Sequence, residues 1–189
     1  MFVSILVMAF LILVGIGVIA YIVAIFNGLI QLKNNIKKSW ANIDVLLKQR
    51  YDELPNLVEA VKGYMKHEKQ VLMEITMART ALSSATSKSD KAGFNDKLSK
   101  NIKTVFAVAE NYPKLQASEN FLKLQERISA LENEIADRRE FYNDSVNNYN
   151  IRIQSIPDVV VARMLKYTEE DLFKATDDEK KVVKVDTNN

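Results

Sequence analysis

The sequence predicts an all-α protein in which a single N-terminal transmembrane helix continues into an elongated antiparallel four-helix bundle. Two observations lead to this fold class. The first 32 of the 189 residues contain no charged side chain, although the chain has 26 Lys+Arg and 24 Asp+Glu. After them, apolar residues recur at spacings of three and four, which is the period of a helix and differs from the alternation of a strand.

Residues 1–28 are predicted to form the transmembrane helix. Of the 25 residues from Phe2 to Phe26, 22 are apolar, and as a helix they would be about 38 Å long, against roughly 30 Å of bilayer hydrocarbon. The competing interpretation is a cleaved signal peptide with Val18-Ile19-Ala20 at the cleavage site. A retained span is favoured because no basic residue precedes the apolar core and that core is too long.

The flanking charges predict the orientation of a single-pass protein in the cell membrane. Lys33, Lys37, Lys38, Lys48 and Arg50 follow the span, and no charged side chain precedes it. Positive residues are retained in the cytoplasm, so we expect the N-terminus outside and the bundle inside. An exported bundle remains the alternative.

Small residues form a stripe along one face of the span. Gly17, Ala20, Ala24 and Gly28 follow one another at spacings of three, four and four. Because small residues let helix backbones approach closely in lipid, this face is a candidate surface for homo-oligomers.

Residues 29–166 are predicted to form the bundle, in coiled-coil-like segments that the three prolines help to delimit. The expected helices are 29–51, 54–84, 92–111 and 118–156, with a short helix at 158–166. The core-facing stripe of the first is Leu29, Leu32, Ile36, Trp40, Ile43 and Leu47, and that of the fourth is Phe121, Leu124, Ile128, Leu131, Ile135, Tyr142, Val146, Tyr149, Ile153 and Ile156. Residues 167–189 are predicted to be a disordered charged tail.

The short last helix has no obvious place among four long ones. Its apolar residues predict a segment that docks on the bundle or on a neighbouring molecule. They are Val159, Val160, Val161, Met164 and Leu165.

Several charged residues fall where the helical period predicts apolar ones. Glu68 and Arg79 do so in the second helix, and Arg139 or Arg138 does so in the fourth, depending on the direction of counting. Together with Asp44 and Glu110, they are predicted to form a buried ionic layer that fixes helix register. The alternative is that their stems lie on the stripe while their charged ends reach solvent.

The composition argues against catalysis. The chain has no Cys and one His, His67, and it lacks a glycine-rich phosphate loop, so we expect no catalytic residue, cofactor or metal site. Nucleic acid is not an expected partner either, because the net charge is only +2 and no stretch concentrates it. We interpret Trp40, Tyr112, Tyr142 and Tyr149 as packing residues, and the Asn-rich stretch 143–150 as a source of interhelical hydrogen bonds or a contact face.

Long motifs resemble the LemA family of bacterial membrane proteins. They are W-x-x-I-D-V from Trp40, R-x-D-x-x-P-N-L-V from Arg50, E-N-Y-P from Glu110 and F-Y-N-D from Phe141, and the similarity covers about residues 25–166. The resemblance implies one span in the bacterial inner membrane followed by a helical bundle. It also implies that Arg139, rather than Arg138, is the family's arginine. It brings no known reaction, and a relative in magnetosome formation suggests a role in membrane organisation.

The expected function is therefore a non-enzymatic scaffold, anchored in the lipid bilayer, that self-associates and organises or shapes membrane. The alternative is a membrane-bound signalling or adaptor module that binds a heterologous partner protein through its bundle.

Overall fold

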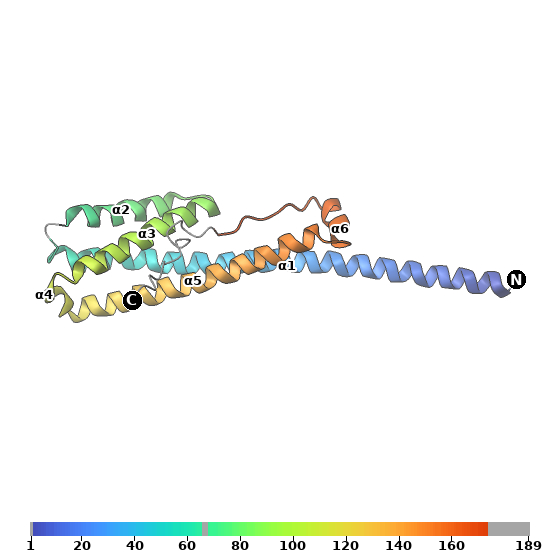
Figure 1. The fold of residues 1–189 in the computed structure, drawn as a ribbon, viewed down its shortest axis with the longest axis horizontal. Helices are drawn as coiled ribbons and strands as arrows, with labels where there is room; N and C mark the ends of the chain where they lie inside the picture. The colour runs from blue at the N-terminus through green and yellow to red at the C-terminus, as the bar shows by residue number, and fades with distance from the viewer. Residues whose placement is uncertain (1, 66–67, 174–189) are drawn as a thin grey trace, which may run out of the picture. The chain divides into compact units, whose positions relative to one another are not determined.

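The computed structural model describes residues 2–65 and 68–173, and within these ranges every regular element is a helix (Figure 1). This confirms the predicted all-α class and the long apolar N-terminal helix. The helices are α1 (Phe2–Lys62), α2 (Lys69–Ser84), α3 (Lys88–Ala109), α4 (Pro113–Gln116), α5 (Glu119–Gln154) and α6 (Asp158–Met164).

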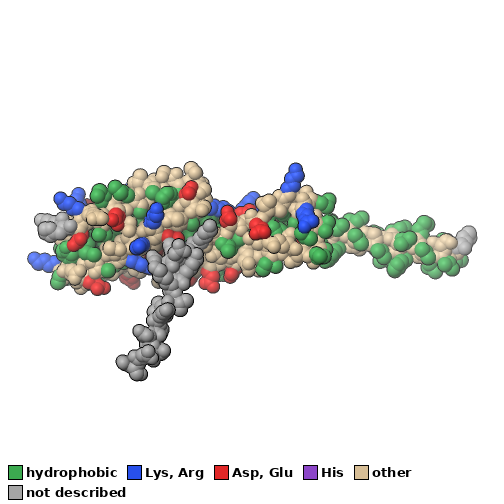
Figure 2. Space-filling model, turned by 45° about the horizontal axis from the view of Figure 1, so that its top comes forward, with side chains coloured by type: hydrophobic (Ala, Val, Ile, Leu, Met, Phe, Trp, Pro, Cys, Tyr) green, Lys and Arg blue, Asp and Glu red, His purple; other side chains and the backbone are tan. Residues whose placement is uncertain are grey.

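The N-terminal part of α1 is bare. Every side chain from Phe2 to Ala24 is exposed, and within α1 an 18-residue window reaches a mean hydropathy of 3.0. Figure 2 shows hydrophobic side chains along this part and none of the charged colours. The helix is thus long and apolar enough to cross a membrane, which fits a membrane anchor.

The predicted helix boundary between residues 51 and 54 is wrong, because α1 continues through Pro55 to Lys62. Proline inside a helix costs about 3 kcal/mol, since it removes one backbone hydrogen bond and crowds the preceding turn. Beside it, however, Leu54, Leu57 and Val61 are fully buried. Each such side chain stabilises the fold by about 1.5–3 kcal/mol, so their burial outweighs the cost of the proline.

The predicted helix 54–84 is divided in the structure, because α1 ends at Lys62 and α2 begins only at Lys69. The next connection is shorter than predicted. The connection expected between residues 84 and 92 shrinks to residues 85–87 because Ser87 caps α3, its hydroxyl accepting from the N–H of Asp90 at 3.0 Å. Pro113 begins the single turn α4, where a proline loses no helical hydrogen bond. The helix predicted at 118–156 is α5, and the short one predicted at 158–166 is α6.

The chain divides into two compact units, and α1 and α5 contribute to both. Unit 1 comprises Met1–Ala41 and Glu140–Leu172, and unit 2 comprises Asn42–Arg139 and Phe173–Asn189.

Unit 2 has a hydrophobic core to which α1, α2, α3, α4 and α5 all contribute. Phe121 of α5 packs edge-to-face on Phe106 of α3, with ring centroids 6.3 Å apart. The buried cluster comprises Leu54, Leu57, Val61, Met65, Ile75, Ala78, Leu82, Leu98, Ile102, Val105, Ala109, Leu115, Phe121 and Ile128.

Unit 1 is built on the contact between α1 and α5. The rings of Trp40 and Tyr142 meet edge-on at 5.6 Å, and the hydroxyls of Ser39 and Ser145 lie 3.3 Å apart. Nearer the bare part of α1, the guanidinium of Arg152 covers Gly28. From one contact to the next, the residue on α1 moves toward the N-terminus while the residue on α5 moves toward the C-terminus.

The predicted stripes of α1 and α5 form much of the core of both units. Leu29, Ile36, Ile43 and Leu47 of α1 are buried, as are Tyr142, Val146, Tyr149 and Ile153 of α5. Ile156 is the exception on α5, because it follows the end of the helix and is exposed.

Candidate functional site

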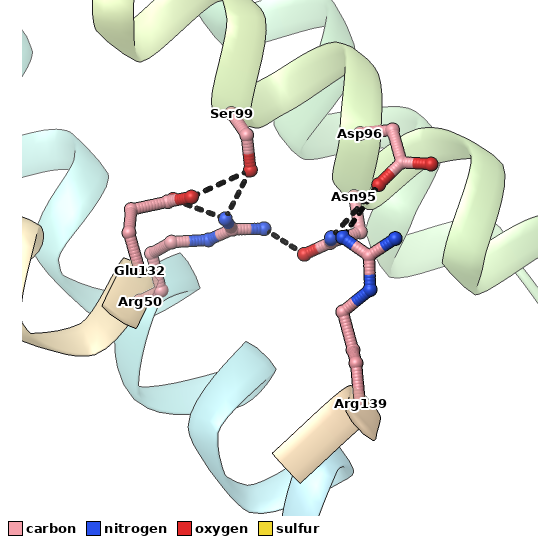
Figure 3. Close-up of polar contacts among 6 residues, drawn as sticks. All are labelled: Arg50, Asn95, Asp96, Ser99, Glu132 and Arg139. Carbon is pink, nitrogen blue, oxygen red and sulfur yellow. Dashed lines mark hydrogen bonds and ion pairs between the residues drawn. The ribbon is translucent and has the colours of Figure 1, made fainter. Parts of the chain in front are cut away.

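A buried arginine lies at the centre of the polar cluster of unit 2 (Figure 3). The side chain of Arg50 has no solvent exposure. Its Nη1 donates to the hydroxyl of Ser99 at 2.8 Å and to the carboxylate of Glu132, and its Nη2 donates to the amide oxygen of Asn95. Ser99 also donates to Glu132 at 2.7 Å, so one arginine links α1, α3 and α5.

Sequence reasoning missed Arg50 and Asn95, although the helical period places both on core-facing stripes. Arg50 continues the stripe three residues after Leu47 and four before Leu54. Asn95 stands three residues before Leu98, on the buried side of α3. The helical period thus indicates that both side chains face the core, although charged and amide side chains are normally solvent-exposed.

The second arginine of the cluster is Arg139, one of the predicted site residues. It forms an ion pair of 3.1 Å with Asp96, and both side chains are nearly buried. Asp96 also accepts from the amide of Asn95 at 3.4 Å, which joins this pair to the Arg50 contacts. The guanidinium carbon of Arg139 lies 4.4 Å from the ring centroid of Phe173.

Burial governs the electrostatics of this cluster. It lowers the pKa of Arg50 below the ordinary value, and the Glu132 carboxylate opposes that shift by its charge and its hydrogen bond. The Nε of Arg50 is buried without a hydrogen-bond partner. A compensated buried charge of this kind stabilises little on net, but it penalises any register in which the partners separate.

The other predicted members of the ionic layer lie in separate contacts. Asp44 pairs with Lys91, and Glu68 accepts from the hydroxyl of Tyr112 at 3.5 Å. Arg79 stacks 4.2 Å from the ring centroid of Tyr51, whereas Glu110 is exposed at the C-terminal cap of α3. These contacts do not join the five residues in one layer, because the helical period fixes which face a residue occupies but not its height along the neighbouring helix.

Two hollows adjoin these residues. A groove of about 860 Å³ between α3 and α5 is lined by Asp96, Ser99, Glu132 and Arg139 among others, and a hollow of about 330 Å³ is lined by Asp44, Tyr51 and Lys91 among others. Within residues 2–65 and 68–173, no three His, Asp or Glu side chains come together in a way that could hold a metal ion. His67 lies outside the described residues.

In unit 1, the segment after α6 packs against α5, which corrects the predicted disordered tail for residues 167–173. We call residues 166–172 the strap. The hydroxyls of Tyr149 and Tyr142 donate to the carbonyls of Thr168 and Asp171 at 3.2 and 3.1 Å. Asn150 exchanges two hydrogen bonds of 2.9 Å with the backbone of Glu170. Residues 174–189 lie outside the described ranges.

These hydrogen bonds give the predicted packing tyrosines a second role. Burial raises the pKa of Tyr142 and of Tyr149, and the neighbouring Glu170 raises both further. Their rings pack in the core of unit 1 while their hydroxyls hold the strap. The Asn-rich stretch likewise supplies one strap contact, through Asn150.

The strap begins with a well-formed end of α6. Lys166 adopts a left-handed backbone with φ of 54°. The N–H of Tyr167 bonds the carbonyl of Ala162 at 3.0 Å, and the N–H of Lys166 bonds that of Arg163 at 3.1 Å. This is the Schellman arrangement, which satisfies the last carbonyls of a helix and turns the chain back.

The predicted docking segment is divided between the interior and the surface. Val161 is buried in unit 1, Val159 and Leu165 are half-buried, and Val160 and Met164 are exposed. Arg152, which sequence reasoning did not single out, pairs with Asp158 at the start of α6.

The predicted small-residue stripe is open only in part. A Cβ placed on Gly28 would lie 2.8 Å from Nη2 of Arg152, whereas nothing approaches within 4 Å of one placed on Gly17. Ala20 and Ala24 are exposed. The open part of the stripe therefore comprises Gly17, Ala20 and Ala24.

Comparison with known proteins agrees with the motifs. The family model described as the LemA family matches residues 39–186. Protein LemA of Metamycoplasma hominis is 27% identical over 179 residues, which cover 94% of this chain and 80% of that protein. Since the family model covers more than half of the sequence, the chain belongs to the LemA family.

Proposed function

We propose that this LemA-family protein is a non-enzymatic scaffold that α1 anchors in the membrane, and that it self-associates there to organise or shape the bilayer. The observation that carries the proposal is the continuity of α1. Its apolar N-terminal part is bare, and the same unbroken helix then enters the buried core. A helix of this kind links the folded part of the chain directly to lipid.

The long helices support a mechanical rather than a chemical role. We infer that α1, α2, α3 and α5 form an antiparallel four-helix bundle, with coiled-coil-like packing between their stripes. The charged residues at its centre, such as Arg50 and Glu132, engage one another in hydrogen bonds and ion pairs. Such contacts position helices relative to one another.

We infer that the helical body faces the cytoplasm from the bacterial inner membrane. Lys33, Lys37 and Lys38 follow the span directly, and positive residues are retained on that side. A C-terminal fusion to a fluorescent protein should therefore fluoresce, whereas a fusion to alkaline phosphatase should be inactive. The opposite pair of results would establish the exported topology.

We infer self-association through Gly17, Ala20 and Ala24. The test compares Gly17→Leu with Gly15→Leu in the full chain, reconstituted in vesicles and crosslinked. Neither glycine has a neighbour within 4 Å, but two residues apart on a helix they face nearly opposite sides. Gly17→Leu should reduce the crosslinked oligomer while Gly15→Leu leaves it unchanged. Equal crosslinking in both variants, or a strict monomer in the parent chain, would contradict self-association through this face.

Electron microscopy of the protein in vesicles tests membrane organisation itself. Ordered arrays, closed rings or a change of vesicle curvature would support the scaffold. Isolated copies in vesicles of unchanged shape would count against it.

One observation favours the alternative, an adaptor that binds a heterologous partner protein. Phe141 and Ile151 are 66% and 55% exposed on α5, and the exposed Asn148 lies between them in sequence. Large apolar side chains interspersed with amides are typical of protein contact surfaces. Co-purification of one heterologous protein at equal stoichiometry, lost in Phe141→Ser but kept in Gly17→Leu, would select the adaptor over the scaffold.

A further inference from the structure

We propose that α6 lies on the membrane surface beside the span, with Ile156, Val160 and Met164 inserted into the lipid interface. This inference rests on the proposed membrane anchor. It gives the chain a second, peripheral contact with the bilayer.

One side of α6 is committed to unit 1 and the other is bare. Asp158, Val161 and Ala162 are buried. By contrast, Ile156 in the preceding turn is 89% exposed, and Val160 and Met164 are 60% and 79% exposed. Val160 and Met164, about one turn apart on α6, thus lie uncovered on one side of the helix, and Ile156 is uncovered in the turn that precedes it.

The contacts within unit 1 place α6 next to the end of the bare span. Arg152 bonds Asp158, in the first turn of α6, and covers Gly28 of α1. Just after α6, the ring of Tyr167 lies 4.4 Å from Nζ of Lys33. The bare part of α1 ends at Ala24, so α6 begins about one helical turn beyond it.

The length of the bare segment matches the bilayer. The 23 residues from Phe2 to Ala24 form about 35 Å of helix, compared with roughly 30 Å of hydrocarbon. When they span it, the hydrocarbon ends close to Ala24, about one helical turn before Gly28. Helices that lie in the interface place their apolar side about 5–10 Å into the headgroup boundary, which is the depth available to α6.

The charges around α6 suit an anionic lipid surface. Arg163 and Lys166 are exposed beside the apolar side chains, and Figure 2 shows basic and hydrophobic colours together where the bare part of α1 begins. Of the acidic residues of the strap, Asp171 lies farther along, since it bonds Tyr142, ten residues before Arg152 on α5. Glu169 remains close to α6, because it lines a hollow with Val159 and Arg163. Basic residues near the surface are attracted to anionic headgroups.

Lipid fits this surface better than a second copy of the chain. Stable protein interfaces bury roughly 1,200 Å² or more, and three side chains on a seven-residue helix supply only a fraction of that area. A bilayer requires no complementary shape, and the proposed anchor already brings one next to this part of α1.

The chain has no cysteine, so single cysteines can carry an environment-sensitive fluorophore on the full protein. Met164→Cys reports on α6. Met77→Cys is the matched control, because Met77 is 61% exposed on α2, and Leu13→Cys reports on the span. Each labelled protein is reconstituted in phosphatidylcholine–phosphatidylglycerol vesicles and quenched by a lipid-attached nitroxide or by aqueous iodide.

We expect lipid nitroxide to quench the labels at 13 and 164 several-fold more strongly than the label at 77, with iodide showing the reverse order. If the label at 13 is quenched by lipid but that at 164 behaves like 77, the surface contact is wrong and the anchor stands. If the label at 13 escapes the lipid quencher, the anchor itself fails. Protection of 164 from both quenchers identifies a protein cover and overturns the proposal.

A second set of variants separates contact from folding. In Val160→Ser/Met164→Ser, a label at Ile156→Cys should lose its lipid quenching, because the remaining apolar surface is too small to hold the segment in the interface. Met73→Ser/Met77→Ser is the control, since both residues are exposed on α2. An unchanged signal at 156 in the first variant would contradict the proposal.

Discussion

The ion pair between Arg50 and Glu132 should be the most sensitive electrostatic contact in unit 2. The side chain of Arg50 is fully buried and that of Glu132 is 20% exposed. Glu132→Leu removes the countercharge and leaves the guanidinium with two neutral acceptors, on Ser99 and Asn95. Leaving a buried charge uncompensated costs about 3–5 kcal/mol, so we expect a loss of that size in the free energy of unfolding.

The double variant Arg50→Met/Glu132→Leu should recover most of this loss. Methionine keeps a long apolar stem where the arginine stem lies, and no charge remains to be compensated. Apolar replacement of a complete buried ion pair is often neutral or stabilising. The double variant is thus expected to be more stable than Glu132→Leu. Comparison with Arg50→Met as the second single variant then measures the coupling between the two side chains.

Urea unfolding of the full chain in detergent micelles, followed by far-ultraviolet circular dichroism, measures both effects. Glu134→Leu is the control on the same helix, because the pair of Glu134 with Arg138 is exposed at 3.4 Å. It should shift stability by no more than about 1 kcal/mol. If Glu132→Leu behaves like Glu134→Leu, or if the double variant is the least stable of the set, the buried charge does not control this core.

Two further predictions concern the strap. The pKa values of Tyr142 and Tyr149 are raised in the folded state, so their contribution to stability is present below pH about 10 and is lost as the pH rises through the folded pKa values. Absorbance titration at 295 nm should show two phenols that ionise late and that disappear in Tyr142→Phe/Tyr149→Phe. Uniform ionisation of the tyrosines in the parent chain would contradict this. Lys166→Gly should raise the melting temperature, since glycine adopts the φ of 54° without the roughly 1 kcal/mol penalty of a side chain, whereas Lys33→Gly should lower it; a lower melting temperature for Lys166→Gly would refute the cap.

The fold could be predicted from the sequence because its apolar residues recur with a clear helical period. The spacing of Ile36, Ile43 and Leu47 defines the buried side of α1, and all three are buried in the structure. The helix start predicted near Pro55 is wrong because it followed local propensity alone. The buried residues on either side of Pro55 favour one continuous helix.

The polar contacts were harder to predict for a physical reason. Periodicity shows that Arg50 faces the core, but the identity of its partners depends on how far the helices are shifted along one another. A shift of one turn moves a side chain by about 5.4 Å, which is enough to exchange partners. The contacts of Asp44 and Glu68 could not be predicted for that reason. The strap could not be predicted because its hydrogen bonds use backbone carbonyls, which any sequence supplies.

The unbroken α1 also has a consequence for the order of folding during synthesis. Starting a new helix is unfavourable by a factor of about 10⁻³, whereas extending an existing one is not. If residues 2–24 become helical in the bilayer, as the proposed anchor requires, the residues that follow can extend that helix as they leave the ribosome, with no new start before Lys62. The proposed anchor would then make the membrane the template on which the rest of the chain begins to fold.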